Sequence, residues 1–335
     1  MADSSCSNLQ SPISNLQSDF IMAKKVAIVA VGGNSLILDN KHQTVQDQYK
    51  AAAETMKHIA EMIVKGWDVV ITHGNGPQVG YVLARSEYSR GILHEIPLDT
   101  CGADTQGAIG YNFQMALDNE FKKRGLKKSA ATVVTQVLVD KNDPSFKKPS
   151  KPIGQFYSEE EAHKRKEKDG WDIMEDAGRG WRRVVASPDP KEIIELAAIK
   201  TLVDAGVVTV AVGGGGIPVI RDENGDLKGT AAVIDKDLAS ALLATNLSAD
   251  LLLISTAVEK VCLNFGKPDQ KALDKMTLAE AKKYIDEGHF KPGSMLPKMK
   301  AIVKFLENGG KQALITDPAH IPQALDGKTG TWIVP

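Results

Sequence analysis

The sequence is poor in cysteine, in aromatic residues and in long apolar runs. Its 335 residues include three cysteines, Cys6, Cys101 and Cys262, and no C-x-x-C pair. This odd, low number argues against a disulfide framework or a zinc site, so we expect a reducing, cytoplasmic environment. Aromatic residues make up 5% of the chain, too few for base-stacking platforms. No apolar run approaches the length that crosses a membrane.

The chain also lacks a charge excess of either sign. The formal net charge is −1, with 41 basic and 42 acidic residues. This balance gives no overall attraction to nucleic acid or to an anionic membrane, so small molecules are the expected partners. An anionic substrate would therefore be bound by local lysines and backbone N–H groups. The length suffices for one large α/β unit or two smaller domains.

The first 21 residues differ from the rest of the chain. They are rich in Ser, Asn and Gln, and they repeat SNLQS at Ser7–Ser11 and Ser14–Ser18. They lack the basic start and apolar centre of a secretory signal. We therefore expect residues 1–21 to be a disordered N-terminal tail. Met22 directly precedes the first apolar run and is a candidate translation start.

From Lys24 onward, apolar runs that end in glycine alternate with helical patterns. Lys24–Gly33 and Trp67–Pro77 are typical of buried strands, and Val45–Lys65 has apolar residues at helical spacing. Further strands are expected at Ala130–Val139, Val207–Val212, Leu251–Ile254, Ala313–Ile315 and Thr331–Val334, and further helices after Pro77 and at Pro190–Ala205, Asp235–Leu247 and Thr277–Glu287. Continuously apolar strands alternating with helices predict an α/β fold whose mostly parallel sheet is covered on both faces.

Two segments interrupt this alternation. Asp140–Gly180 is rich in Lys, Pro, Gly and Trp and is too long for a simple loop. We assign residues 140–182 to an inserted, protruding subdomain or lid. In Pro218–Gly229, the Asn224-Gly225 pair lies between two short extended runs, which predicts a β-hairpin.

Three glycine-rich turns follow apolar strands: Gly32-Gly33-Asn34, Gly74-Asn75-Gly76 and Gly213–Gly216. Each alone is typical of an ordinary strand-to-helix turn. Together, at the carboxyl edge of a parallel sheet, they favour a surface that binds anionic groups through backbone N–H groups. The phosphate-binding GxxxxGK[ST] loop and the dinucleotide GxGxxG pattern are absent from these turns. We interpret His73 as a loop residue that hydrogen-bonds its turn rather than as an acid or base.

A set of motifs in fixed order carries a resemblance. They are VGGNSL (Val31–Leu36), THGNGPQVG (Thr72–Gly80), PLDTCGADTQGAIGY (Pro97–Tyr111), KPIGQFY (Lys151–Tyr157), VASPDP (Val185–Pro190), GGGGIPV (Gly213–Val219), AVIDKDLAS (Ala232–Ser240) and GSMLPK (Gly293–Lys298). Together they resemble the carbamate kinases, a branch of the amino-acid kinase superfamily. The match runs from Lys24 to the C-terminus.

This resemblance implies an open αβα sandwich over residues 22–335, with a small protruding subdomain, and a homodimer. It also implies MgATP and a carbamoyl group as ligands at the sheet edge. The reaction of the family is reversible: ATP and carbamate give ADP and carbamoyl phosphate. In the family it usually runs towards ATP at the end of the arginine dihydrolase pathway.

By resemblance, the catalytic residues are Lys236 and Lys298, which contact the transferring phosphoryl group, and Asp237, which organises the two lysines. Helix capping remains the alternative role for Asp237. The resemblance also implies a lysine from the inserted segment, and we choose Lys151. Since insert lengths vary, Lys141 and Lys148 remain alternatives to Lys151.

The other ligand-binding residues follow from the same resemblance. Carbamate carries its own attacking oxygen, so the protein has to align two anions rather than supply a nucleophile. The expected phosphoryl and carbamate contacts are Gly32, Gly33, Asn34, Gly74, Asn75 and Gly76. The expected nucleotide contacts are Gly213, Gly214, Gly215 and Gly216, with an apolar adenine wall of Ala257, Val258, Val261 and Cys262. Magnesium is the expected metal, and no residue is assigned as its ligand.

Two other functions are open alternatives. A kinase for another acyl acceptor, such as acetylglutamate, would usually carry a lysine where this chain has Ala30. A catalytically silent nucleotide sensor would be expected to lose the phosphoryl-contacting lysines, yet Lys236 and Lys298 are present. Both observations favour the carbamate branch.

Overall fold

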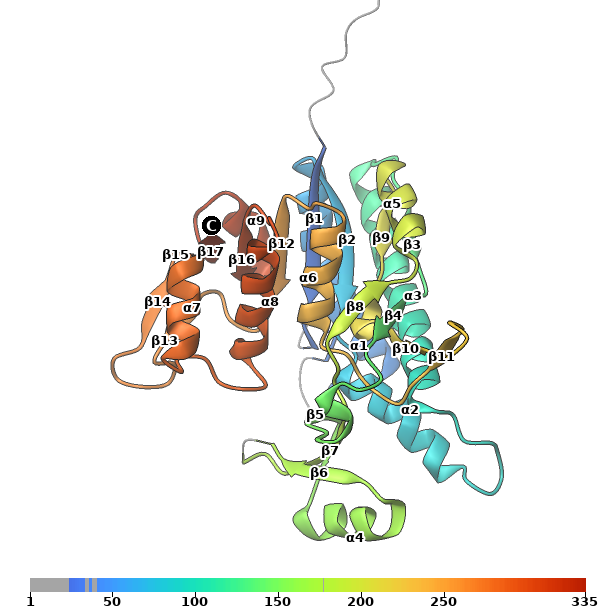
Figure 1. Cartoon of the computed structure of the whole chain (residues 1–335). Coiled ribbons are helices and arrows are strands. Elements are labelled where there is room, and N and C mark those ends of the chain that lie inside the picture. Colours follow the sequence, from blue (N-terminus) through green and yellow to red (C-terminus); the bar gives the residue numbers. More distant parts are fainter. Residues whose placement is uncertain (1–23, 34–35, 38–40, 177) are drawn as a thin grey trace, which may run out of the picture.

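The computed structural model describes residues 24–33, 36–37, 41–176 and 178–335. The tail expected at residues 1–21 and the expected ligand contact Asn34 lie outside this range. Figure 1 shows a central sheet flanked by helices, with a smaller group of strands and one helix projecting from one end.

The central sheet has eight strands and is mostly parallel, as the sequence predicted. Its order is β15 (Lys275–Thr277), β17 (Thr331–Val334), β16 (Ala313–Thr316), β12 (Leu251–Ser255), β1 (Lys25–Val31), β2 (Trp67–His73), β9 (Val208–Val210) and β3 (Ala130–Thr132). Only the β16–β17 pair is antiparallel among these described strands. Since β1, β2 and β9 are parallel neighbours, their carboxyl ends meet at one edge.

The strands of this sheet are buried on both faces. In β1, Ala27, Val29 and Val31 belong to one apolar core, and Ile28 and Ala30 belong to a second core on the opposite face. This division follows from the two-residue side-chain period of a strand. It explains why the strand sequences are continuously apolar rather than alternating.

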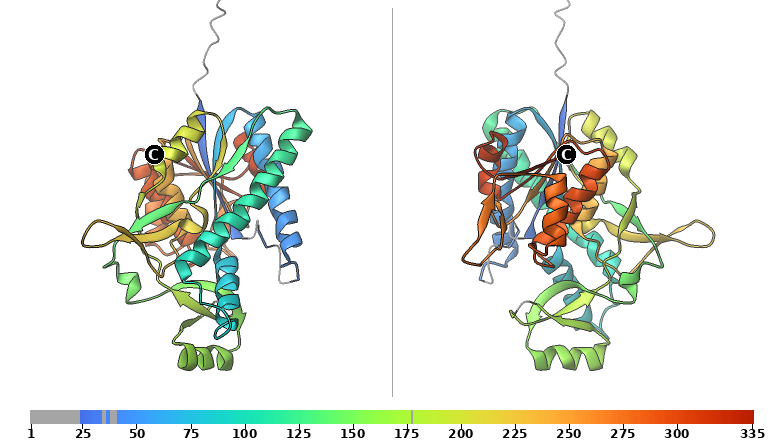
Figure 2. Two further views of the ribbon diagram at one scale, coloured as in Figure 1. Left: turned by 90° about the vertical axis from the view of Figure 1, so that its right-hand side faces the viewer. Right: turned by 60° about the vertical axis from the view of Figure 1, so that its left-hand side comes forward.

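Helices cover each face, which confirms the αβα layering (Figure 2). The described helices are α1 (Val45–Val64), α2 (Gly76–Tyr88), α3 (Leu98–Arg124), α4 (Glu159–Asp169), α5 (Leu196–Asp204), α6 (Lys236–Asn246), α7 (Leu278–Asp286), α8 (Met295–Glu307) and α9 (Ile321–Leu325). Helices α1, α3 and α9 supply one core, and α5, α6, α7 and α8 supply the other. Among the described helices, none combines the length and apolar character needed to span a bilayer.

Capping residues fix several helix starts. Thr44 and Asp47 form a capping box at α1, and Thr277 and Glu280 form the one predicted at α7. These reciprocal hydrogen bonds satisfy N–H groups that the first helical turn leaves free. The sequence therefore determined these boundaries locally.

Three smaller sheets complete the fold. One contains β11 (Leu227–Gly229), β10 (Ile217–Arg221), β4 (Gln136–Val139) and β8 (Pro190–Ile193), and one pairs β13 (Val261–Leu263) with β14 (Lys271–Leu273). The third contains β5 (Lys151–Tyr157), β7 (Trp181–Val185) and β6 (Asp172–Glu175), and lies with α4 at the projecting end in Figure 1. The hairpin predicted at Asn224-Gly225 joins β10 to β11, with Gly225 at φ 87°. That residues 140–182 act as a separate subdomain stays a prediction.

Two sequence predictions were wrong in detail. The run Ala130–Val139 is not one strand, because β3 pairs in the central sheet and β4 pairs with β10 and β8. The expected helix Pro190–Ala205 begins instead as strand β8 and becomes helical only at Leu196. In both cases pairing with a distant strand decided the local structure, which sequence periodicity does not report.

Candidate functional site

The three glycine-rich turns meet at the edge where β1, β2 and β9 end. The N–H of Gly32 donates to the carbonyl of Ser255 (3.0 Å), and that of Gly74 donates to Val31 (3.1 Å). The turn Gly213–Gly216 follows β9, the next strand along. The prediction that these turns share one edge is therefore confirmed.

Gly74 packs closely against Lys236. A Cβ placed there would lie 3.3 Å from the Cδ of Lys236, so the turn passes tightly against that lysine stem. At Gly33 and Gly76, by contrast, a Cβ would meet no atom of the described residues within 4 Å, so neither position needs glycine for a close approach.

Asn75 connects two of the turns to α3. Its Nδ2 donates to the Oγ1 of Thr105 (2.8 Å) in α3. A Cβ on Gly214 would lie 2.3 Å from the same Nδ2, so the tetraglycine turn packs directly on the Asn75 amide. Gly214 has φ 67°, which also favours glycine there.

Asp237 joins the two predicted phosphoryl-binding lysines. Lys236 is the first residue of α6, and its Nζ donates to Oδ1 of Asp237 at 2.5 Å. Lys298, near the start of α8, donates to Oδ2 of the same carboxylate at 3.0 Å. The Asp237 side chain is only 4% exposed. The structure thus brings together all three residues that were selected from two distant motifs.

The electrostatics favour the charged forms of Asp237 and Lys298. Burial would raise the pKa of Asp237, but Lys236 and Lys298 outweigh it and hold that pKa well below the ordinary range. Burial likewise opposes the charged form of Lys298, yet the neighbouring Asp237 raises its pKa. For Lys236 burial prevails and lowers the pKa, partly offset by Asp237.

Lys151 reaches the same place from the projecting sheet. It is the first residue of β5, and its Nζ donates to Oδ2 of Asp235 at 2.5 Å. The other oxygen of Asp235 caps α6 by accepting from the backbone N–H of Asp237 (2.9 Å). Lys141 and Lys148, the alternatives, are both exposed to solvent. Of these three lysines, Lys151 is the one that the structure places beside α6.

His73 is fully buried at the end of β2. Its Nδ1 hydrogen-bonds the carbonyl of Gly74 (3.1 Å), as predicted, and its ring meets Phe113 edge-on at 5.6 Å. Burial lowers the pKa of His73 to about 4, so the ring is neutral at pH 7. Since the carbonyl can only accept, Nδ1 carries the proton. The Nε2 atom has no hydrogen-bond partner among the residues that the structure describes, and it lies against Gly213.

The residues expected to contact adenine occupy different environments. Ala257 is exposed, while Val258 and Cys262 are half-buried. Val261 is fully buried in the core beside α6 and α8. Ala257, Val258 and Cys262 can therefore contact a ligand, whereas the Val261 side chain packs in the core.

Two residues at this edge were not selected from the sequence. For Asp235, helix capping and a catalytic role were equally open from the sequence, and its pairing with Lys151 depends on a fold contact between segments 84 residues apart. Gln106 is buried in α3 and hydrogen-bonds the tetraglycine turn. A signal for Gln106 existed, because it is spaced three and seven residues before Ile109 and Phe113, which share the buried face of that helix.

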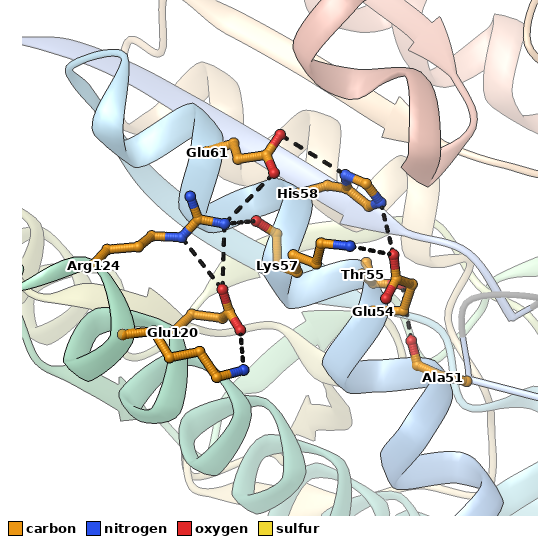
Figure 3. Close-up of polar contacts among 9 residues, drawn as sticks. Ala51, Glu54, Thr55, Lys57, His58, Glu61, Glu120 and Arg124 are labelled. Carbon is orange, nitrogen blue, oxygen red and sulfur yellow. Dashed lines mark hydrogen bonds and ion pairs between the residues drawn. The ribbon is translucent and has the colours of Figure 1, made fainter.

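A second cluster of charged side chains joins α1 to α3 away from the glycine turns (Figure 3). Arg124 contacts Glu61 and Glu120, while His58 lies between Glu54 and Glu61. Most members are partly exposed and each pair is formed within the two helices. Such pairs contribute little individually, so we assign this cluster to helix packing.

Comparisons with known proteins agree with this geometry. Residues 25–317 match the model of the amino acid kinase family. The chain is 52% identical to the carbamate kinase-like protein YahI of Escherichia coli, covering 93% of this chain and 99% of that protein. It is 50% identical to a carbamate kinase of Thermococcus kodakarensis, over 92% of this chain and 99% of the other.

Solved structures give the same result. A carbamate kinase from Giardia lamblia bound to AMP-PNP has a TM-score of 0.86 and 42% identity to this chain, covering 93% of it and 99% of the Giardia chain. The same Giardia protein bound to citric acid has a TM-score of 0.89 at 41% identity, with the same coverage. The similarity therefore extends over both sequence and fold.

Proposed function

The chain belongs to the amino acid kinase family and, within it, to the carbamate kinases, and on this premise we propose that it transfers a phosphoryl group reversibly between carbamoyl phosphate and ADP. The observation that carries the proposal is the Lys236–Asp237–Lys298 trio at the glycine edge. Two ammonium groups held on one carboxylate can face two reacting anions at once.

The protein supplies alignment and positive charge. Carbamate attacks the terminal phosphorus of ATP through its own oxygen, and the bond from that phosphorus to ADP breaks. In the reverse direction a terminal ADP oxygen attacks the phosphorus of carbamoyl phosphate, and carbamate leaves. Lys236 and Lys298 stabilise the equatorial oxygens of the phosphoryl group as it passes. Asp237 keeps both ammonium groups at fixed positions, so little reorganisation is needed in the transition state. Lys151 adds a third ammonium from the projecting sheet.

The glycine turns bind the two reactants. We assign the phosphoryl and carbamate groups to the backbone of Gly32, Gly33 and the Gly74–Gly76 turn, because the stem of Lys236 lies against Gly74. The nucleotide lies along Gly213–Gly216 and the wall that includes Cys262. The Giardia complex with AMP-PNP supports an ATP-binding role for this fold.

Magnesium fits this site as an ion carried by the nucleotide. Among the described residues, no three His, Cys, Asp or Glu side chains gather as a metal cage. The two carboxylates at the edge, Asp235 and Asp237, are each bound to lysine. Magnesium commonly keeps its waters and binds through substrate phosphates, where it neutralises their charge.

We further propose a homodimeric, cytoplasmic enzyme that works towards ATP at the end of arginine dihydrolase catabolism. The low cysteine count and the family resemblance support this setting. A size measurement in solution tests the dimer. The ratio of the forward to the reverse rate at cellular metabolite concentrations tests the direction.

The deciding experiment measures ATP formed from carbamoyl phosphate and MgADP. We expect rapid turnover by the wild type and a loss of about 100-fold or more in Lys236→Ala and in Lys298→Ala. Lys300→Ala is the matched control, because Lys300 lies on the same helix as Lys298 but is exposed. A folded wild type that binds nucleotide and makes no ATP would overturn the proposal in favour of another acyl acceptor, such as acetylglutamate, or a silent sensor.

A further inference from the structure

The tetraglycine turn begins with a residue in an unfavourable backbone conformation. Val212 has φ 52° and ψ 33°, in the left-handed region that β-branched residues rarely occupy. It is fully buried, so its side chain cannot relax towards solvent. Such a conformation persists only where its surroundings hold it, and it points to a constraint on the turn that follows.

Gln106 supplies that constraint from α3. Its Nε2 donates to the carbonyl of Gly213 (2.9 Å) and to that of Thr135 (3.1 Å). Its Oε1 accepts from the backbone N–H of Thr135 (2.8 Å). The side chain is 1% exposed, so water does not compete for these bonds. One amide thus links the turn to the segment between β3 and β4.

Thr135 holds the strained residue from the other side. Its Oγ1 accepts from the N–H of Val212 at 3.0 Å. Gln106 therefore fixes Thr135, and Thr135 fixes Val212, while Gln106 also fixes Gly213 directly. The turn is held at two consecutive residues.

The position of this turn is transmitted to the lysine site. A Cβ on Gly215 would lie 2.5 Å from the carbonyl oxygen of Ile234, so the turn packs against the backbone just before Asp235. Asp235 caps α6, whose first residue is Lys236. A shift of the turn therefore displaces the start of α6 or opens a gap beside it.

We propose that Gln106 is a positioning residue of the phosphoryl-transfer site, acting through the tetraglycine turn on Lys236. This inference rests on the proposed function. Gln106 itself is buried, and its side-chain amide bonds to the backbone of Gly213 and Thr135. Substituting Gln106 keeps both lysines in the chain but displaces their side chains. Small displacements of catalytic groups lower the reaction rate.

The test compares Gln106→Met with Gln114→Met in the full chain. Gln114 lies on the same helix and donates to the carbonyl of Ala130 (3.4 Å), away from the turn. We expect kcat to fall about 10- to 100-fold in Gln106→Met, as is typical when a catalytic group is misplaced by about 1 Å, and to stay within about twofold in Gln114→Met. Thermal midpoints of both variants control for general destabilisation.

A second readout does not depend on catalysis. Hydrogen exchange of the peptide covering residues 211–217 is expected to be faster in Gln106→Met and unchanged in Gln114→Met. If the wild type makes no ATP, the proposed function fails, while this exchange still tests how Gln106 holds the turn. Should Gln106→Met not fold, Thr135→Val removes the bond to Val212 with little change in volume, and it is expected to give the same two effects.

A wild-type kcat in Gln106→Met would overturn the proposal. So would equal losses of kcat in Gln106→Met and Gln114→Met that follow their thermal midpoints, because both would then reflect stability alone. Unchanged exchange at residues 211–217 in Gln106→Met, or in Thr135→Val if that variant has to be used, would also reject the proposal.

Discussion

The Nζ of Lys151 lies 2.5 Å from Oδ2 of Asp235, and this contact joins the projecting sheet to the first turn of α6. The two side chains are 26% and 15% exposed. A lysine on a flexible four-carbon stem is thereby held beside the N-cap of α6. The contact also distinguishes Lys151 from the other lysines of the inserted segment.

Replacing Lys151 tests that distinction. We expect Lys151→Ala to lower kcat for ATP formation by about 100-fold, because one of the three ammonium groups that we propose to face the phosphoryl group is lost. Lys148→Ala is the matched control, since Lys148 belongs to the same segment and is exposed. Equal losses in the two variants would show that the segment contributes through its overall charge rather than through Lys151.

Removing the shared carboxylate is expected to destabilise the fold. Asp237→Asn leaves Lys236 and Lys298 buried without their counter-charge, at a cost of about 3–5 kcal/mol in the free energy of unfolding. Urea unfolding at pH 7 measures this. Asp204→Asn is the control: Asp204 pairs with Lys200 at 2.8 Å, but both side chains are more than 60% exposed, so about 1 kcal/mol or less is expected.

The stability that the Asp237 carboxylate contributes depends on pH in a defined direction. The pKa of Asp237 is lowered in the folded chain, so the unfolded chain takes up a proton first as the pH falls. The stability that Asp237 contributes is therefore present above about pH 4, the ordinary pKa of Asp, and is lost progressively below it. Unfolding followed from pH 6 to pH 3 should show this loss in the wild type and a weaker one in Asp237→Asn.

His73 should destabilise the protein in mild acid. Its folded pKa of about 4 lies below the ordinary value of 6.5, so between these values the unfolded state binds the proton and the folded state does not. Stability is then lost as the pH falls from about 6.5 to about 4, by about 3 kcal/mol over the full range. His73→Gln should reduce this loss of stability over the same pH range, whereas the exposed control His163→Gln should leave it unchanged.

Gly80 should be intolerant of any side chain. A Cβ on Gly80 in α2 would lie 2.1 Å from the Cα of Gly154 in β5. Gly80→Ala is therefore expected to cost about 1–3 kcal/mol of stability and to lower kcat, because β5 carries Lys151. Gly107→Ala is the control: Gly107 is also helical, has nothing within 4 Å of its Cβ position, and should gain up to about 1 kcal/mol. Normal activity in Gly80→Ala would mean that β5 shifts without moving Lys151.

The sequence predicted those features that depend on neighbouring residues. The capped helix α7, the hairpin at Gly225 and the helix beginning at Lys236 all follow from local turn and capping chemistry. The shared edge of the glycine turns followed from the parallel order of the strands. Lys236, Asp237 and Lys298 came from the family resemblance, and the structure places them together.

Features that depend on distant contacts were missed. Helix α3, which covers Leu98–Arg124, contains Gly102, Gly107 and Gly110, which weaken a helical pattern. Gly110 is needed there because a Cβ would lie 2.4 Å from the Cγ2 of Thr132 on β3. Tertiary packing thus requires the glycine that obscures the helix in the sequence.

The formal charges of the lysines and aspartates at the sheet edge do not cancel. Lys151, Lys236 and Lys298 bring three positive charges against the two negative charges of Asp235 and Asp237. The surplus favours the binding of small oxyanions in general, including inorganic phosphate or sulfate in a buffer. We therefore expect a phosphate buffer to inhibit the very reaction being assayed.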